Sequence, residues 1–242
     1  CVAFGAGAAG TLNMWYESDI DALMKRTCLR PIPTGKISKN HALVFGLITA
    51  IFSVCMLYIF SNLLSALMLL ITILFYVVIY TILLKQRTSQ NIVIGGAAGA
   101  FPPIIGWTIA MNSITLEPII LFLIIFLWTP SHFWALSLYK IEDYNNANIP
   151  MLPLVSGVHL TKVNIFIYAL LLVVISIAPY FFGFSGLVYL LSSTILGFYY
   201  VYLCLKLLLI SKDEKIVAKQ IFIYSILYLF LIFSIILIDK LL

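Results

Sequence analysis

Long apolar runs alternate along the chain with short stretches that are rich in charged residues, proline, glycine and asparagine. Each run approaches the roughly 20 residues that a helix needs to cross the hydrocarbon core of a bilayer. The runs lack the alternation of a half-buried strand, and lipid offers no hydrogen-bond partner to an unpaired backbone group. The pattern therefore predicts eight helical segments, at residues 1–25, 41–60, 63–84, 92–112, 117–139, 161–182, 184–209 and 216–238.

The composition excludes a soluble domain. Hydrophobic residues make up 63% and charged residues 10% of the 242 residues, and the mean hydropathy is +1.13, whereas soluble chains are about half apolar and about a quarter charged. The net charge of +5 does not indicate nucleic-acid binding, because the cations lie in short loops between apolar runs. We expect one all-α, polytopic membrane domain over residues 1–242. Because the chain begins with Cys1 and not with methionine, we also expect that residues are missing upstream.

The charges of the loops predict an orientation. If the loop after the first segment is cytoplasmic and the sides alternate, all of the 14 lysines and arginines except Lys240 fall on the cytoplasmic side. All of the nine acids except Glu117 and Asp239 fall there too. An excess of lysine and arginine in cytoplasmic loops is the rule for multi-pass membrane proteins, so this distribution supports both the segments and the orientation.

The end of the first segment carries three oxygen-bearing side chains on one helical face. Asn13, Glu17 and Asp21 are spaced at i, i+4 and i+8, whereas Asp19 points roughly the opposite way. Carboxylates crowded near a membrane are costly, and Mg²⁺ held by a few carboxylates and a substrate phosphate would offset that cost. The simpler alternative is a solvated helix end outside the headgroups. We favour the metal site because arginines follow directly.

Two further polar clusters fall on the same predicted side of the membrane. His132, Tyr139 and Asp143 share a helical face at the end of the fifth segment. Lys85 and Arg87 open the fourth segment, where cations beside helix amides suit a phosphorylated ligand. The simpler alternative for the first cluster is an ordinary loop. For the second, it is that the cations only set the orientation of the protein in the membrane. Convergence of acids and cations on one side favours a shared site.

Two stretches of small residues predict close helix packing. The stretch from Gly5 to Gly10 matches a dinucleotide-binding string, but no strand precedes it, so we interpret it as a packing surface. The stretch from Gly95 to Gly99 has the same interpretation, and Pro102-Pro103 then predicts a kink or an interruption.

Four motifs together carry a resemblance to a known family. They are the ladder Asn13-Glu17-Asp21 with residues 24–31, the run 80–107, the run 128–134, and Asp143-Tyr144 with residues 147–153. This set, which covers nearly the whole chain, resembles the UbiA-type intramembrane prenyltransferases. With a histidine at position 132, the chain is more similar to the haem-specific branch of this family than to the branches that act on quinone precursors. The resemblance implies a nine-helix bundle, of which this chain would hold eight helices.

The resemblance also implies a role for each candidate residue. The metal ligands would be Asn13, Glu17, Asp21 and Asp143. The diphosphate would be bound by Arg26, Arg30, Lys85, Arg87, Asn91 and Lys140. The acceptor would be bound by His132, Tyr139 and Tyr144. The chain departs from the family pattern at Glu17, where many relatives have Asp, and at Tyr139, where an acid is common, so the second metal site is expected to be weaker or built differently.

The implied reaction is transfer of a farnesyl group from farnesyl diphosphate to a vinyl group of haem B, with addition of water, giving haem O and diphosphate. The resemblance implies Mg²⁺ as cofactor, the lipid bilayer as surroundings and the downstream haem A synthase as partner. It implies a bacterial inner membrane protein with its active site on the cytoplasmic side. Two alternatives stay open: a relative that prenylates an aromatic quinone precursor, and a cation or proton transporter, whose acids should lie near mid-bilayer in broken helices.

Two interpretations of His132 compete. It lies on the face of Asp143 but three turns deeper, roughly 16 Å along the axis at ~1.5 Å rise per residue, which a haem could span and a diphosphate could not. Trp128, Phe133 and Trp134 would then supply apolar surface to the porphyrin. The alternative is a packing histidine that is hydrogen-bonded to a neighbouring helix.

Overall fold

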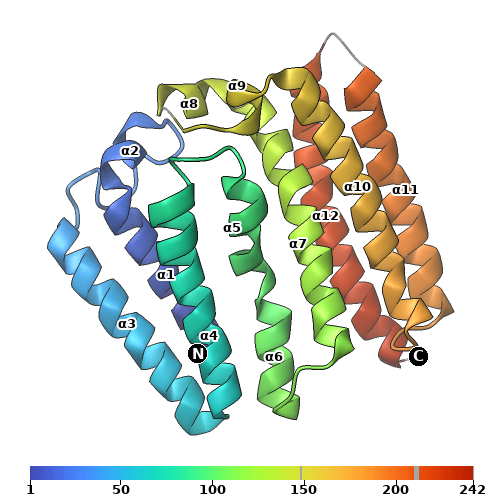
Figure 1. The fold of residues 1–242 in the computed structure, drawn as a ribbon, viewed down its shortest axis with the longest axis horizontal. Coiled ribbons are helices and arrows are strands. Elements are labelled where there is room, and N and C mark those ends of the chain that lie inside the picture. Colours follow the sequence, from blue (N-terminus) through green and yellow to red (C-terminus); the bar gives the residue numbers. More distant parts are fainter. Residues whose placement is uncertain (148, 210–212, 242) are drawn as a thin grey trace. The chain divides into compact units, whose positions relative to one another are not determined.

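The computed structural model describes residues 1–147, 149–209 and 213–241, and all regular structure in these ranges is helical (Figure 1). Asn148 of the fourth motif and Lys212 among the loop cations lie outside the described residues. The chain divides into two compact units. Unit 1 comprises Cys1–Pro118 with Glu142–Pro150, and unit 2 comprises Ile119–Ile141 with Met151–Leu242.

Unit 1 is built around the first helix of the chain. Its elements are α1 (Val2–Tyr16), α2 (Ser18–Leu23), α3 (Lys39–Phe60), α4 (Leu63–Leu74), the π-helix η1 (Phe75–Leu84), α5 (Asn91–Ala100), α6 (Pro102–Met111) and most of α8 (Ile141–Asn146). Helix α1 packs against α3, α4 and η1, and α5 packs against η1 (Figure 1). Asn13, near the end of α1, is hydrogen-bonded to Thr81 of η1, so the last turns of α1 lie beside the segment that leads to Lys85.

Local sequence explains how these helices begin, break and approach. The Asn62 side chain accepts a hydrogen bond from the backbone N–H of Ser65 at 2.8 Å and so caps α4. The predicted interruption at Pro102 is confirmed, since α5 ends at Ala100 and α6 begins at the proline. A Cβ atom on Gly5 would lie 2.7 Å from a methyl group of Leu69, so the glycine allows α1 to approach α4 closely.

Unit 2 consists mainly of long helices that are joined by hydrogen bonds between side-chain hydroxyls and by the ion pair between Lys162 and Glu214. Its elements are α7 (Leu116–Tyr139, from Ile119 onward), α9 (Leu152–Val155), α10 (Val158–Phe181), α11 (Leu187–Leu209) and α12 (Glu214–Leu241). Ser131 of α7 is hydrogen-bonded to the Tyr200 hydroxyl of α11 at 2.8 Å, and Tyr228 of α12 donates to Ser176 of α10 at 2.8 Å. These pairs satisfy buried hydroxyls that lipid could not satisfy.

Seven helices of the described chain are long and apolar enough to cross a membrane, which confirms seven of the predicted segments. They are Lys39–Phe60, Leu63–Leu84, Asn91–Met111, Leu116–Tyr139, Val158–Phe181, Leu187–Leu209 and Glu214–Leu241. The predicted count of eight is not confirmed, because the first segment is divided at Glu17.

Candidate functional site

The ladder stays on one face although the first helix breaks within it. Glu17 leaves the helical conformation between α1 and α2, yet its N–H still donates to the carbonyl of Asn13 at 2.9 Å. The N–H of Asp21 in turn donates to the carbonyl of Glu17 at 2.8 Å. The three ladder side chains are 6%, 1% and 3% exposed, in chain order. Their shared burial agrees with the i, i+4, i+8 spacing and argues against a solvated helix end.

Glu17 lies at the centre of a small ionic cluster. One of its carboxylate oxygens, Oε2, accepts a hydrogen bond from the Asn13 amide at 2.9 Å and forms an ion pair with Lys85. The same Asn13 amide nitrogen donates to the hydroxyl of Thr81 at 3.1 Å. The structure therefore brings together Asn13 and Glu17 from the first segment and Lys85 from the loop after η1, as the shared-site interpretation requires.

Asp21 is paired with a different cation. Arg30, in the loop after α2, donates to Asp21 Oδ2 at 2.7 Å. The Thr27 hydroxyl donates to the Asp21 backbone carbonyl at 2.9 Å and so ties this loop to α2. Asp19 instead forms an exposed ion pair with Lys39. Each buried ladder carboxylate thus carries one positive partner, and the acid on the opposite face points away from the cluster.

The cluster has unused capacity for a cation. The second carboxylate oxygen of Glu17, Oε1, is buried and has no hydrogen-bond partner among the described residues, and neither has Asn91 Oδ1. A buried carboxylate oxygen without a donor is costly, and a bound cation would remove the cost. No group of three or more His, Cys, Asp and Glu side chains gathers in the described ranges. A magnesium ion would therefore use Glu17 and an amide oxygen, with phosphate oxygens completing the shell, and the donor set fits that demand.

The start of α5 orders the loop that carries Lys85. Asn91 is buried, and its amide nitrogen donates to the backbone carbonyls of Lys85 at 3.1 Å and Thr88 at 2.8 Å. Arg87 and Arg26 are exposed to solvent. Diphosphate binding by Arg26, Arg87 and Asn91 stays a prediction, and the contacts of Asn91 give it an observed role in holding this loop.

The second acidic motif lies on α8. Asp143 and Tyr144 are both buried. Burial raises the pKa of the Tyr144 phenol above its ordinary value, the Arg26 guanidinium lowers it and the Asp143 carboxylate raises it. Arg26 therefore acts electrostatically on α8. That Asp143 shares one site with the ladder stays a prediction.

Three of the predicted site residues, His132, Tyr139 and Lys140, have observed contacts within unit 2. His132 is buried, with Nδ1 2.6 Å from the Ser225 hydroxyl and its ring stacked on Trp128 and Phe222 at centroid distances of 4.2 and 4.7 Å. Lys140 lies over the Tyr139 ring, 4.9 Å from its centroid. His132 thus has the contacts of a packing histidine. Binding of an acceptor by His132, Tyr139 and Tyr144, and of diphosphate by Lys140, stays a prediction.

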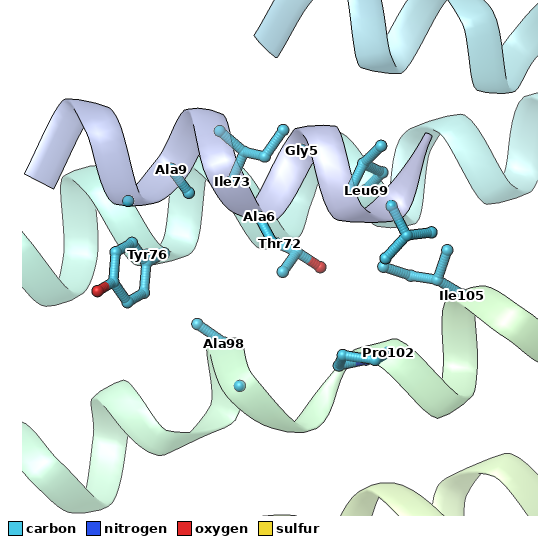
Figure 2. Close-up of a pocket in the computed structure, with 13 residues that line it drawn as sticks. Gly5, Ala6, Ala9, Leu69, Thr72, Ile73, Tyr76, Ala98, Pro102 and Ile105 are labelled. Atoms are coloured by element: carbon cyan, nitrogen blue, oxygen red, sulfur yellow. The ribbon is translucent and has the colours of Figure 1, made fainter. Parts of the chain in front are cut away.

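An apolar cavity that sequence reasoning did not identify continues the ladder face. Its volume is about 300 Å³, and it lies between α1, the α4–η1 segment and the break between α5 and α6. Figure 2 shows Tyr76 at one end and Leu69 with Ile105 at the other. Ala9 lines it one turn before Asn13, so the cavity follows the same face of α1 away from the ionic cluster. The sequence signal was the row of small residues in α1, which we interpreted only as packing.

The comparisons with known proteins agree on one family. The model described as the UbiA prenyltransferase family matches residues 1–226. A protein from Pelagibacter ubique named protoheme IX farnesyltransferase is 63% identical to this chain, over 100% of this chain and 80% of its own length. A protein of the same name from Rhizobium rhizogenes is 53% identical, over 100% of this chain and 76% of its own length.

Solved structures with low sequence identity share the fold. A structure reported for digeranylgeranylglyceryl phosphate synthase has a TM-score of 0.77 at 20% identity, over 98% of this chain and 81% of that chain. A UbiA homologue from Archaeoglobus fulgidus bound to GPP and Mg²⁺ has a TM-score of 0.67 at 16% identity, over 97% of this chain and 84% of that chain. At these identities the likeness concerns the fold alone.

Proposed function

The chain belongs to the UbiA prenyltransferase family, and we propose that it transfers a farnesyl group from farnesyl diphosphate to a vinyl group of haem B. Water adds in the same reaction, and the products are haem O and diphosphate. The observation that carries the proposal is the 63% identity, over the whole chain, to a relative named protoheme IX farnesyltransferase. The buried ionic cluster supports the same chemistry, because a departing diphosphate needs both a metal and fixed cations.

The donor headgroup is assigned to the ionic cluster. Mg²⁺ would be held by Glu17, the amide oxygen of Asn13 and phosphate oxygens, and Asp21 and Asp143 are the further predicted ligands. When bound, it would neutralise charge on the leaving diphosphate so that the allylic C–O bond can ionise. Lys85 would donate hydrogen bonds to the diphosphate oxygens. The other residues predicted to bind the diphosphate are Arg26, Arg30, Arg87, Asn91 and Lys140. This assignment is supported by the unpaired Glu17 oxygen and by the Lys85 ammonium beside it.

The donor tail is assigned to the apolar cavity. The side chains that line the cavity are apolar except for the hydroxyls of Thr72 and Tyr76. Such walls exclude water from an allylic cation. The volume of about 300 Å³ lies at the lower end of the range for small-molecule sites. Its alignment with Asn13 on one face of α1 supports a donor that runs from the cluster into the membrane.

The remaining assignments concern the acceptor and the cell. Haem B lies against the predicted acceptor residues, His132, Tyr139 and Tyr144, and the cluster faces the cytoplasm of a bacterium. The side of the membrane rests on the loop cations. Haem O then passes to haem A synthase as the consuming enzyme. A phenolic quinone precursor as acceptor is less supported, because relatives with 50 to 63% identity carry the haem-prenylating name.

The test is product formation by the full-length protein in membranes that contain no haem O. We expect haem O, identified by mass spectrometry, when farnesyl diphosphate, haem B and Mg²⁺ are supplied together, and no product when the metal is chelated. Prenylation of 4-hydroxybenzoate without haem O would assign the chain to the quinone-precursor branch. No prenylated product from either acceptor would overturn the transferase assignment.

A further inference from the structure

We propose that Thr81 is a positioning residue that fixes the side-chain amide of Asn13, so that the oxygen of this amide and not its nitrogen is offered to the metal. The proposal deepens the proposed function and rests on it. It concerns a threonine within an apolar span, and the sequence motifs gave that threonine no role.

Both hydrogens of the Asn13 amide nitrogen are committed. One is donated to Glu17 Oε2 at 2.9 Å and the other to Thr81 Oγ1 at 3.1 Å. An asparagine side chain has two donor hydrogens and one acceptor oxygen. With both hydrogens committed, only Oδ1 remains for a further ligand, and an oxygen is the ligand that Mg²⁺ requires.

The orientation of this amide follows from the chemistry of its neighbours. The Thr81 hydroxyl donates its single hydrogen to the backbone carbonyl of Tyr76 at 2.9 Å. The hydroxyl can then only accept at its remaining positions, and an ionised Glu17 carboxylate can only accept. A flipped Asn13 amide would set an oxygen lone pair against one of these acceptors, so the observed orientation is the stable one.

The π-helical geometry of η1 gives Thr81 its place in this chain of hydrogen bonds. The accepting carbonyl of Tyr76 is five residues before Thr81, whereas a threonine in a regular α-helix bonds the carbonyl three or four residues back. Thr81 is fully buried. Gly95 of α5 permits the neighbouring turn, because a Cβ atom there would lie 2.1 Å from the ring of Tyr80. Short π-helical segments occur often at functional sites, where they re-aim side chains.

The chain offers a matched control in the same unit. Thr108 is also fully buried, accepts a hydrogen bond from the Ser65 hydroxyl at 3.1 Å and donates to the carbonyl of Ile105 at 3.0 Å. Its hydroxyl therefore accepts from another helix and donates to its own, as that of Thr81 does. It has no bond to the ladder. Thr108→Val removes an equivalent pair of hydrogen bonds without touching Asn13.

The experiment measures Mg²⁺-dependent binding of farnesyl diphosphate to the full-length protein without haem B, so that no turnover occurs. We expect Thr81→Val to raise the Mg²⁺ concentration for half-maximal binding about 10-fold, the lower range for the loss of a residue that orients a metal ligand. Thr81→Ser keeps the hydroxyl and should stay near wild type, as should Thr108→Val. In an Asn13→Ala background, Thr81→Val should add no further change in the Mg²⁺ requirement.

Three results would overturn the proposal: an unchanged Mg²⁺ requirement in Thr81→Val, an equal shift in Thr108→Val, or a full additional shift in the Asn13→Ala background. If Thr81→Val does not fold, Thr81→Cys takes its place, because a thiol fills similar space and is a weak acceptor. Wild-type protein that binds no farnesyl diphosphate in the presence of Mg²⁺ would instead refute the proposed function. The two failures are therefore distinguishable.

Discussion

The two units bury polar groups in different ways. Unit 1 buries acids and cations at one end of its helices, and Glu17 Oε1 and Asn91 Oδ1 have no partner there. Unit 2 buries neutral hydroxyls within its helices, where Ser131–Tyr200 and Tyr228–Ser176 satisfy one another, and its buried cation Lys162 is paired with Glu214. A satisfied neutral network stabilises helix packing, whereas a charged cluster with unused oxygens is prepared for a ligand. The unpaired carboxylate oxygen of Glu17 is what distinguishes the candidate metal site in unit 1 from the paired groups of unit 2.

Asp21→Asn tests the charged side of this contrast. It removes one carboxylate from the proposed metal site, so we expect haem O formation to fall by about 100-fold, the upper range for loss of metal-site partners. Membrane insertion should be unchanged, because the apolar segments and loop cations stay the same. The measurements are haem O yield and the amount of protein in washed membranes. Normal haem O formation at limiting Mg²⁺ would mean that Asp21 is not a ligand.

Lys85→Gln and Lys39→Gln form a matched pair. Lys85 is bonded to the buried Glu17, whereas Lys39 is bonded to Asp19, whose side chain is 86% exposed. We expect Lys85→Gln to raise the KM for farnesyl diphosphate about 10-fold, as for the loss of one charge-assisted hydrogen bond. Lys39→Gln should leave it unchanged, because exposed ion pairs contribute little. Equal effects of the two changes on KM would remove the distinction between cluster and surface.

His132→Ala asks whether unit 2 is only a scaffold. If His132 contacts the acceptor, haem binding weakens severalfold with a changed Soret absorption, while affinity for farnesyl diphosphate stays near that of wild type. If it only packs, the protein loses stability through the Ser225 hydrogen bond and the stacked rings, with an unchanged haem spectrum. Weakened diphosphate binding with a normal haem spectrum would place the two substrates the other way round.

Tyr228→Phe should have the smallest effect. It removes the hydroxyl that donates to Ser176 and keeps the ring that stacks on Tyr200. We expect a loss of about 1 kcal/mol of stability, the typical value for one neutral hydrogen bond, measured by thermal denaturation in detergent. The Mg²⁺ requirement should not change. A shifted Mg²⁺ requirement would show that the neutral network of unit 2 influences the metal site.

Features set by residues a few positions apart were predictable from the sequence. The ladder spacing places three side chains on one face within two turns, and Pro102 interrupts its helix through its own missing N–H. Both follow from the local geometry of a helix. The sequence could not give the contact between Asn13 and Thr81, which are 68 positions apart, because such contacts depend on how helices pack.

Other features depended on geometry that apolar sequence does not encode. The apolar pattern of residues 75–84 is compatible with an α-helix as well as a π-helix, so it did not indicate the π-helix. The break at Glu17 was missed because Asn13, Glu17 and Asp21 keep the spacing of one continuous helix across it. For His132, the sequence offered both a packing role and an acceptor role, and neighbours from α12 supply the observed packing.

The π-helix makes the ladder contact sensitive to a change in chain length that hydropathy would not register. Deleting Ile79 from η1 would shorten an apolar span by one residue and leave it long enough to insert. The side chains of η1 after the deletion would each move by one helical position about the helix axis, so Thr81 and Lys85 would leave Asn13 and Glu17. We expect such a protein to reach the membrane in normal amount and to bind no farnesyl diphosphate, as membrane fractionation and ligand binding would show. In this segment, the direction of each side chain depends on the exact number of residues, whereas insertion into the membrane depends only on the length of the apolar run.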